Sequence, residues 1–246
     1  MQNQIIDINV DVGEGIGSEA LIMPYMSSCN IACGGHAGDY ETMREVVKLA
    51  KRYQVKIGAH PSFPDKDNFG RQAMDMSCVA LFSCIKNQID NLLGVIDNEH
   101  ALLHHIKPHG ALYNLATVDE KIANVIIEVI KSMVLPVKLY VPYKSVIANL
   151  AAKNGIDMTY EAFADRNYND DLTLVSRLKS NALIEDADAV FKHVFEMISI
   201  QKVTTINNNK KDIKAETFCI HGDNPKVIKL IKNLKEKLEF KGIEIR

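Results

Sequence analysis

The stretch from residue 102 to 110 reads Leu-Leu-His-His-Ile-Lys-Pro-His-Gly, and it decides the fold class. Leu102 to Lys107 is typical of a short strand, and Pro108 ends that strand because proline cannot donate a ladder hydrogen bond. His109 then follows the strand end. In an α/β protein the carboxyl ends of parallel strands share one face, and active sites lie there. The stretch therefore predicts a strand whose polar end faces a site.

Polar motifs of the same kind end other expected strands. Gly58-Ala59-His60-Pro61 ends a strand expected over 55–60, and Cys219-Ile220-His221-Gly222-Asp223 ends one expected over 218–221. A fourth histidine, His36, lies in Cys33-Gly34-Gly35-His36, which we expect to be a loop before a helix. The carboxylates that follow further strands are Asp11, Glu14, Glu161 and Asp165. Side chains more than 200 positions apart are thus expected on one rim, a pattern typical of an enzyme.

Strands and helices alternate along the chain. Further strands are expected over 5–10, 137–141, 157–163 and 243–245, and a long glycine-rich loop follows the first of them. Helices are expected over 41–53, 77–96, 117–133, 144–153, 186–200 and 225–241, with a hairpin or loop at 207–211. Thr117 and Glu120 predict a capping box for the third helix. About seven strands are expected, which is close to the number that a closed barrel needs. We therefore predict an α/β fold, a distorted (β/α) barrel, as a single domain over residues 1–246.

Composition excludes several classes of protein. The net charge is −2 over 246 residues with both signs interspersed, which is unlike the basic stripe of a nucleic-acid binder. No run of 18 apolar residues predicts a membrane span, and Met1-Gln2-Asn3-Gln4 enters the first strand without the features of a signal peptide. The odd number of cysteines, five, suggests no disulfide framework. We therefore expect a cytoplasmic protein that uses neither nucleic acid nor membrane as a partner.

The rim residues suit acid–base chemistry or metal binding. Asp11 and Glu14 can divide acid and base roles if their surroundings separate their pKa values. The alternative, which accounts equally well for these two residues, is that Asp11 caps a turn and Glu14 faces solvent. His60, His109 and His221 can shuttle protons or bind a metal, and a purely structural role is the alternative for each of them.

Two further motifs carry weaker signals. Cys29-x3-Cys33-x2-His36 is a weak zinc motif because no second pair completes it, and Cys33 as a nucleophile is a further alternative to a small buried cysteine. Arg71, Lys107 and Arg166 lie beside rim motifs and could clamp a carboxylate or phosphate. An internal ion pair of Arg166 with a neighbouring carboxylate, Asp165 or Glu161, is the alternative. The chain has no Walker motif.

Taken in order, these motifs resemble those of the LamB/YcsF family from about residue 5 to residue 245. The matching stretches are Asn9–Gly15, Ser28–Asp39, Gly58–Asp65, Lys107–Tyr113, Glu161–Arg166 and His221–Asp223. The chain departs from the family pattern at Cys29 and Gly35, where alanine and phenylalanine are expected, and at Leu172, where glycine is common. Gly35 would enlarge the pocket beside His36.

The resemblance implies a distorted β/α barrel similar to that of polysaccharide deacetylases. It also implies ATP-dependent opening of 5-oxo-L-proline to glutamate together with partner subunits B and C, and the missing P-loop fits ATP activation in those partners. On the matching motifs, the catalytic candidates are Asp11, Glu14, His60, His109, Asp165 and His221. The candidates for substrate binding are His36, Arg71, Lys107, Glu161 and Arg166. Whether a divalent metal is bound is left open.

Two other classes of function fit the same residues. One is a metal-dependent amidohydrolase or deacetylase that uses Asp11 and two rim histidines as ligands. The other is a non-catalytic subunit that binds a lactam or a sugar.

Overall fold

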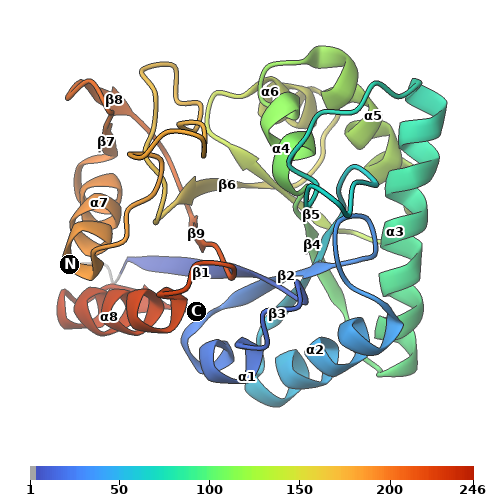
Figure 1. Ribbon diagram of the computed structural model, residues 1–246, viewed down its shortest axis with the longest axis horizontal. Helices are drawn as coiled ribbons and strands as arrows, with labels where there is room; N and C mark the ends of the chain where they lie inside the picture. The colour runs from blue at the N-terminus through green and yellow to red at the C-terminus, as the bar shows by residue number, and fades with distance from the viewer. Residues whose placement is uncertain (1–3) are drawn as a thin grey trace.

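A closed barrel of seven parallel strands forms the centre of the computed structural model, which describes residues 4–246 (Figure 1). The strands are β1 (Ile5–Val12), β2 (Ser28–Ala32), β3 (Lys56–His60), β4 (Leu103–Ile106), β5 (Lys138–Pro142), β6 (Met158–Phe163) and β9 (Thr217–Ile220). They pair in that order, and β9 pairs with β1 to close the barrel. The predicted (β/α) barrel is confirmed. Residues 1–3, which carry part of the expectation about a signal peptide, lie outside the described residues.

Helices surround the barrel and bury its apolar outer face (Figure 1). The longer ones are α2 (Tyr40–Tyr53), α3 (Cys78–Asn98), α5 (Glu120–Lys131), α6 (Val146–Lys153), α7 (Ala187–Ile200) and α8 (Val227–Phe240). Short turns of helix are α1 (Glu19–Ile22), η1 (Met23–Tyr25) and α4 (Gly110–Ala116). Between residues 4 and 246, no helix combines the length and the apolar character that crossing a membrane requires.

Several elements differ from the expectation or extend it. The segment expected as a loop contains β2, whereas the expected terminal strand, β10 (Glu244–Ile245), pairs with β1 outside the barrel. The helix expected from Thr117 begins at Glu120, because Asp119 caps it by accepting from the Ile122 backbone N–H at 3.0 Å. The hairpin expected near 207–211 is confirmed as the antiparallel pair β7 (Lys202–Thr204) and β8 (Lys210–Asp212).

Polar side chains fill the interior of the barrel. Along β1, Asp7, Asn9 and Asp11 alternate with apolar residues, as the two-residue period of a strand requires. The Asn9 amide donates to Glu161 Oε1 of β6 at 2.9 Å and to Thr217 Oγ1 of β9 at 2.7 Å, so one side chain of β1 ties two other strands together. The barrel thus places its polar chemistry inside and its apolar packing outside.

Candidate active site

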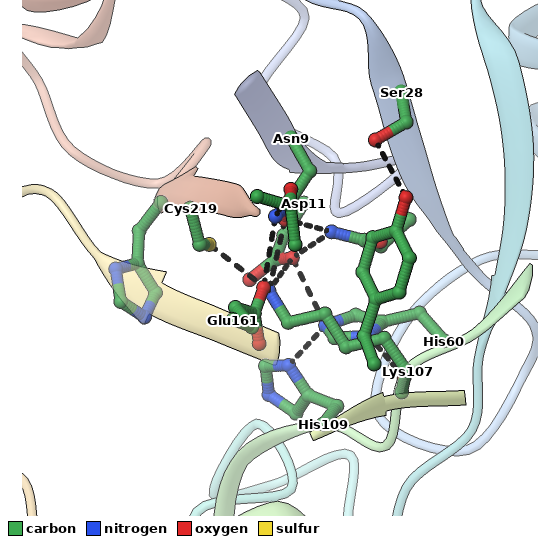
Figure 2. Close-up of polar contacts among 12 residues, drawn as sticks. Asn9, Asp11, Ser28, His60, Lys107, His109, Glu161 and Cys219 are labelled. Carbon is green, nitrogen blue, oxygen red and sulfur yellow. Dashed lines mark hydrogen bonds and ion pairs between the residues drawn. The ribbon is translucent and has the colours of Figure 1, made fainter. Parts of the chain in front are cut away.

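The ammonium group of Lys107 lies at the centre of the polar interior (Figure 2). Its Nζ donates to Asp11 Oδ1 and lies beside Glu161 Oε1, both at 3.0 Å, and it donates to Cys219 Sγ at 2.9 Å. Burial alone would lower the pKa of Lys107, but Asp11, Cys219 and Glu161 hold that pKa well above its usual value. Lys107 is therefore a fixed positive charge that is compensated on two sides.

A cavity of about 790 Å³ opens above this network at the carboxyl ends of the strands. The residues of its wall that were predicted from the sequence are Asp11, His60, Arg71, Lys107, His109, Glu161, Arg166 and His221. Three further predicted residues, Glu14, His36 and Asp165, lie behind this wall and contact residues that line it. The structure thus brings all eleven candidates to one region, and their roles stay predictions.

Three histidines and a carboxylate form a compact buried group in one wall, here called the Glu14 group: Glu14, His36, His60 and His109. His60 Nε2 and His109 Nδ1 lie 2.9 Å apart, and Glu14 Oε1 lies 3.1 Å from His36 Nε2 and 3.6 Å from His109 Nδ1. Burial lowers the pKa of His109 well below its usual value and that of His36 to about 3. Burial and the nearby Asp11 raise the pKa of Glu14. Glu14, His36 and His109 therefore favour their neutral forms.

Asp11 joins the Glu14 group to the Lys107 network. Its Oδ1 accepts from the Asn30 amide at 2.8 Å and lies 3.4 Å from His60 Nε2. Burial alone would raise the pKa of Asp11, but His60 and Lys107 hold it well below its usual value. A carboxylate that favours its ionised form thus lines the cavity.

At the end of β9, the strand that pairs with β1, His221 is held by a buried carboxylate. Asp165 Oδ1 lies 2.8 Å from His221 Nδ1, and Asp165 Oδ2 accepts from the His221 backbone N–H at 3.2 Å. Burial raises the pKa of Asp165, but His221 outweighs this effect and lowers it. An ionised partner on Nδ1 fixes the tautomer of the imidazole, so Nε2 is the nitrogen available to a bound molecule.

Cationic side chains flank the mouth of the cavity. Arg71 forms an ion pair with Asp223, whose carboxylate also lies 3.4 Å from Arg177 Nη1. The Arg166 guanidinium donates instead to the Val175 and Ala182 carbonyl oxygens, at 2.6 and 3.4 Å. The alternative of an internal ion pair for Arg166 is therefore wrong, because backbone acceptors satisfy this side chain.

The expectation that Gly35 enlarges the pocket is also wrong. A Cβ at this position would collide with Gln88 Oε1 and Ser62 Oγ. The Gln88 side chain occupies the space: its Oε1 accepts from the Ser62 backbone N–H at 3.0 Å, and its Nε2 donates to the Ser62 carbonyl at 2.8 Å. The aromatic ring that Gly35 lacks is thus replaced by an amide from α3.

The two cysteines of the weak zinc motif are buried, and burial raises the pKa of each thiol to about 12. Cys29 lies in β2 and Cys33 follows that strand, both with no exposed surface. A thiol with so high a pKa is a poor nucleophile near neutral pH. The Cys33 nucleophile is therefore disfavoured, and these side chains act as small core residues.

Several residues of the site were not anticipated. His105 is buried, with its Nε2 2.7 Å from Asn30 Oδ1 and its ring stacked on Tyr140. Asn9, Asn30 and Arg177 were missed as well. The signal for the interior positions was that polar residues recur at every second position in β1, and again at Ser28 and Asn30. Arg177 lies on a long loop, and nothing in the sequence pattern marks it.

Comparison with known proteins gives one consistent result. The LamB/YcsF family model matches residues 6–246. The 5-oxoprolinase A subunit of Haemophilus influenzae (strain PittEE) is 40% identical over 98% of both chains, and that of Staphylococcus saprophyticus is 39% identical over 98% of this chain and 97% of its own. The crystal structure of a lactam utilization protein from Thermus thermophilus superimposes with a TM-score of 0.91 at 33% identity, covering 99% of each chain. The chain belongs to the LamB/YcsF family.

Proposed function

We propose that this chain is the A subunit of a 5-oxoprolinase, a hydrolase that opens the ring of 5-oxo-L-proline to give L-glutamate. The observation that carries the proposal is the identity of about 40%, over nearly the whole chain, to proteins of that name. The likeness to a lactam utilization protein supports it, because 5-oxoproline is a lactam. The ionised and imidazole side chains that line the cavity suit hydrolysis of a small, charged cyclic amide.

The proposed chemistry starts from the low reactivity of the ring. A five-membered lactam is a poor electrophile, so we propose that ATP phosphorylates the amide oxygen and leaves as ADP. Attack of water on the ring carbon and protonation of the ring nitrogen then break the C–N bond. A second water releases phosphate from the resulting acyl phosphate and leaves glutamate. Proton transfer to and from water and nitrogen is the task that we assign to this chain.

The residues divide between proton transfer and binding. We assign acid–base catalysis to His221, oriented by Asp165, and to Asp11 on the neighbouring strand, with His60 and His109 as further catalytic residues that line the cavity. Arg71 is the candidate for the substrate carboxylate, because its side chain is 36% exposed at the mouth of the cavity. Lys107 is less suited to that role, since two carboxylates already neutralise it, and it positions Asp11 instead.

The partners follow from the same proposal. We propose that subunits B and C bind ATP and complete the enzyme, which is consistent with a chain that lacks a Walker motif. The five cysteines are all unpaired thiols, which supports a reducing, cytoplasmic location.

Glutamate release from 5-oxoproline tests the proposal directly. This chain should release little or no glutamate alone, and the complex with subunits B and C should release it only with ATP. Rapid ATP-independent ring opening by the chain alone would contradict the proposal and favour a metal-dependent amidohydrolase. Unchanged activity of the complex after substitution of the cavity residues would favour a non-catalytic binding subunit.

A further inference from the structure

Two imidazole rings in the cavity wall direct acceptor nitrogens at each other. His60 Nδ1 lies 2.7 Å from the carbonyl oxygen of Lys107, and His109 Nε2 lies 3.0 Å from the carbonyl oxygen of Phe69. A carbonyl oxygen only accepts, so these two ring nitrogens carry the N–H groups. In neutral rings the remaining nitrogens, His60 Nε2 and His109 Nδ1, are both acceptors, and they lie 2.9 Å apart. Two lone pairs at this distance require a cation, either a proton or a metal ion.

The carboxylate of Glu14 lies close to these two facing nitrogens. One donor atom from each member of the Glu14 group is within 4.8 Å of all the others. Ligand atoms bound 2.0–2.1 Å from a tetrahedral zinc ion are about 3.3 Å apart. The separations of 2.9 Å between His60 and His109 and of 3.6 Å between His109 and Glu14 bracket that value. The spacing thus suits a small divalent ion.

Within the Glu14 group, His36 contacts Glu14 and is not placed to share an ion with His109. Its ring is stacked on that of His109 with centroids 3.7 Å apart and planes 4° from parallel. A metal ion lies in the plane of an imidazole that binds it, so one ion cannot lie in both of these planes. His36 Nε2 is 3.1 Å from Glu14 Oε1 and can donate to it. His36 therefore orients the carboxylate.

The backbone that orients His109 is strained. Phe69 has a φ of 56°, in the left-handed region that residues other than glycine rarely adopt, and its carbonyl oxygen receives the His109 N–H. Such a conformation is unfavourable and persists where the surroundings enforce it, often at functional sites. Ligating histidines characteristically donate their second N–H to a carbonyl or carboxylate, as His60 and His109 both do.

We propose that Glu14, His60 and His109 bind a divalent transition-metal ion of the zinc class, with His36 as the residue that orients Glu14. Two imidazoles and one carboxylate are a donor set that Zn²⁺ and Co²⁺ accept, with a further coordination position left for water or substrate. His60 and His109 line the cavity, so an ion that they bind would lie in its wall. The inference goes beyond the proposed function, since metal binding requires neither ATP, nor substrate, nor partner subunits.

Titration of the chelator-treated full chain with Co²⁺ tests this site. We expect one Co²⁺ per chain, with the visible absorption of a four- or five-coordinate ion. Glu14→Gln and His109→Ala should abolish binding, while His36→Ala should weaken it about 10–100-fold, as expected for a residue that supports a ligand. His221→Ala is the matched control: it removes a histidine of the same cavity outside the group and should bind like the unaltered chain.

Other results would overturn the site. Absence of Co²⁺ and Zn²⁺ binding by the unaltered chain would mean that His60 and His109 share a proton. Equal binding by the ligand variants and the control would mean surface binding only. If a ligand variant does not fold, X-ray absorption of the unaltered zinc complex decides, because it must show nitrogen and oxygen ligands with two imidazoles. Intact glutamate release by a chain that binds no metal would reject the metal site and leave the proposed function standing.

Discussion

At the scale of single residues, the cavity pairs each functional group with a partner that fixes its charge or orientation. Asp165 holds His221 by its ring and by its backbone N–H, and Asp165 itself is buried. Lys107 lies between two carboxylates, so each of the three charges depends on the others. A substitution in one of these pairs therefore also changes the charge or the orientation of the residue that remains.

Asp165→Asn should lower kcat for ring opening by about 10²–10⁴-fold with a small change in KM, because the amide no longer fixes the reactive tautomer of His221. The same loss is expected for His221→Gln. The double variant should lose little more, since both changes disable one unit. Steady-state glutamate release by the reconstituted complex measures this, and losses that multiply in the double variant would contradict a shared role.

His109→Ala and Asp11→Asn should each lower the rate by about 10²–10⁴-fold per folded molecule. Asp11 also compensates Lys107, so its variant should unfold at a lower temperature as well. Thermal unfolding measured beside glutamate release separates the two effects. Rates within a few-fold of the unaltered complex for both variants would move the assignment to His60 and His221.

Lys107→Met should destabilise the fold by about 3–5 kcal/mol, because it leaves Asp11 and Glu161 as uncompensated buried carboxylates. Adding Glu161→Gln removes one of these charges and should restore part of the loss. Urea unfolding of the two variants measures the difference. A Lys107→Met chain as stable as the unaltered one would show that water, and not the ammonium group, solvates these carboxylates.

At the scale of elements, strands that line the interior are harder to predict than helices. Strand β4 was evident because Leu103 and Ile106 are apolar. The helices expected over 41–53 and 77–96 are confirmed as α2 and α3, which Asp39 and Ser77 cap. Strand β2 was missed because Ser28 and Asn30 are polar, and only the closed barrel shows that they point inward. The rim histidines were predictable from strand ends, whereas their pairing depends on contacts between distant strands.

The Gln88 side chain of α3 fills the space beside Gly35, so the helix and the loop should be coupled in stability. Gly35→Phe should destabilise the chain by about 1–3 kcal/mol, because the ring would overlap Gln88 of α3. Gln88→Ala makes room, so the double variant should be more stable than the sum of the two single changes predicts. Urea unfolding of all three variants measures this coupling. Strict additivity would show that the loop carrying Gly35 moves aside.

At the scale of the whole molecule, buried histidines link stability to pH. Burial lowers the pKa of His193, on α7, from 6.5 to about 4. Between these values the unfolded chain binds a proton that the folded chain does not, so stability is complete above pH 6.5 and declines as the pH falls. The loss from this residue reaches about 3 kcal/mol near pH 4. Burial also lowers the pKa of His105 and His109, which adds to the loss in the same direction.

His193→Gln should therefore flatten the decline in unfolding free energy between pH 6.5 and pH 4. Urea unfolding across this range measures it against the unaltered chain. His100→Gln, which replaces an exposed histidine on a turn, is the matched control for the substitution itself. Parallel pH curves for the unaltered chain and His193→Gln would show that His193 accepts its proton equally well in both states.

The seam between β1 and β9 also has a consequence for how the chain is made. Asp7 and Asn9 bond Thr217 across a separation of about 210 positions. At a synthesis rate of roughly 5–20 residues per second, β1 leaves the ribosome roughly 10–40 s before its last neighbour exists. Until then β1 and β6 lack the partner strand that β9 will provide, and the edges of the nascent sheet are unpaired. Closure of the barrel is thus a late and slow step, because it depends on contacts between residues far apart in the chain. The cavity is complete only when the final barrel strand, β9, has joined.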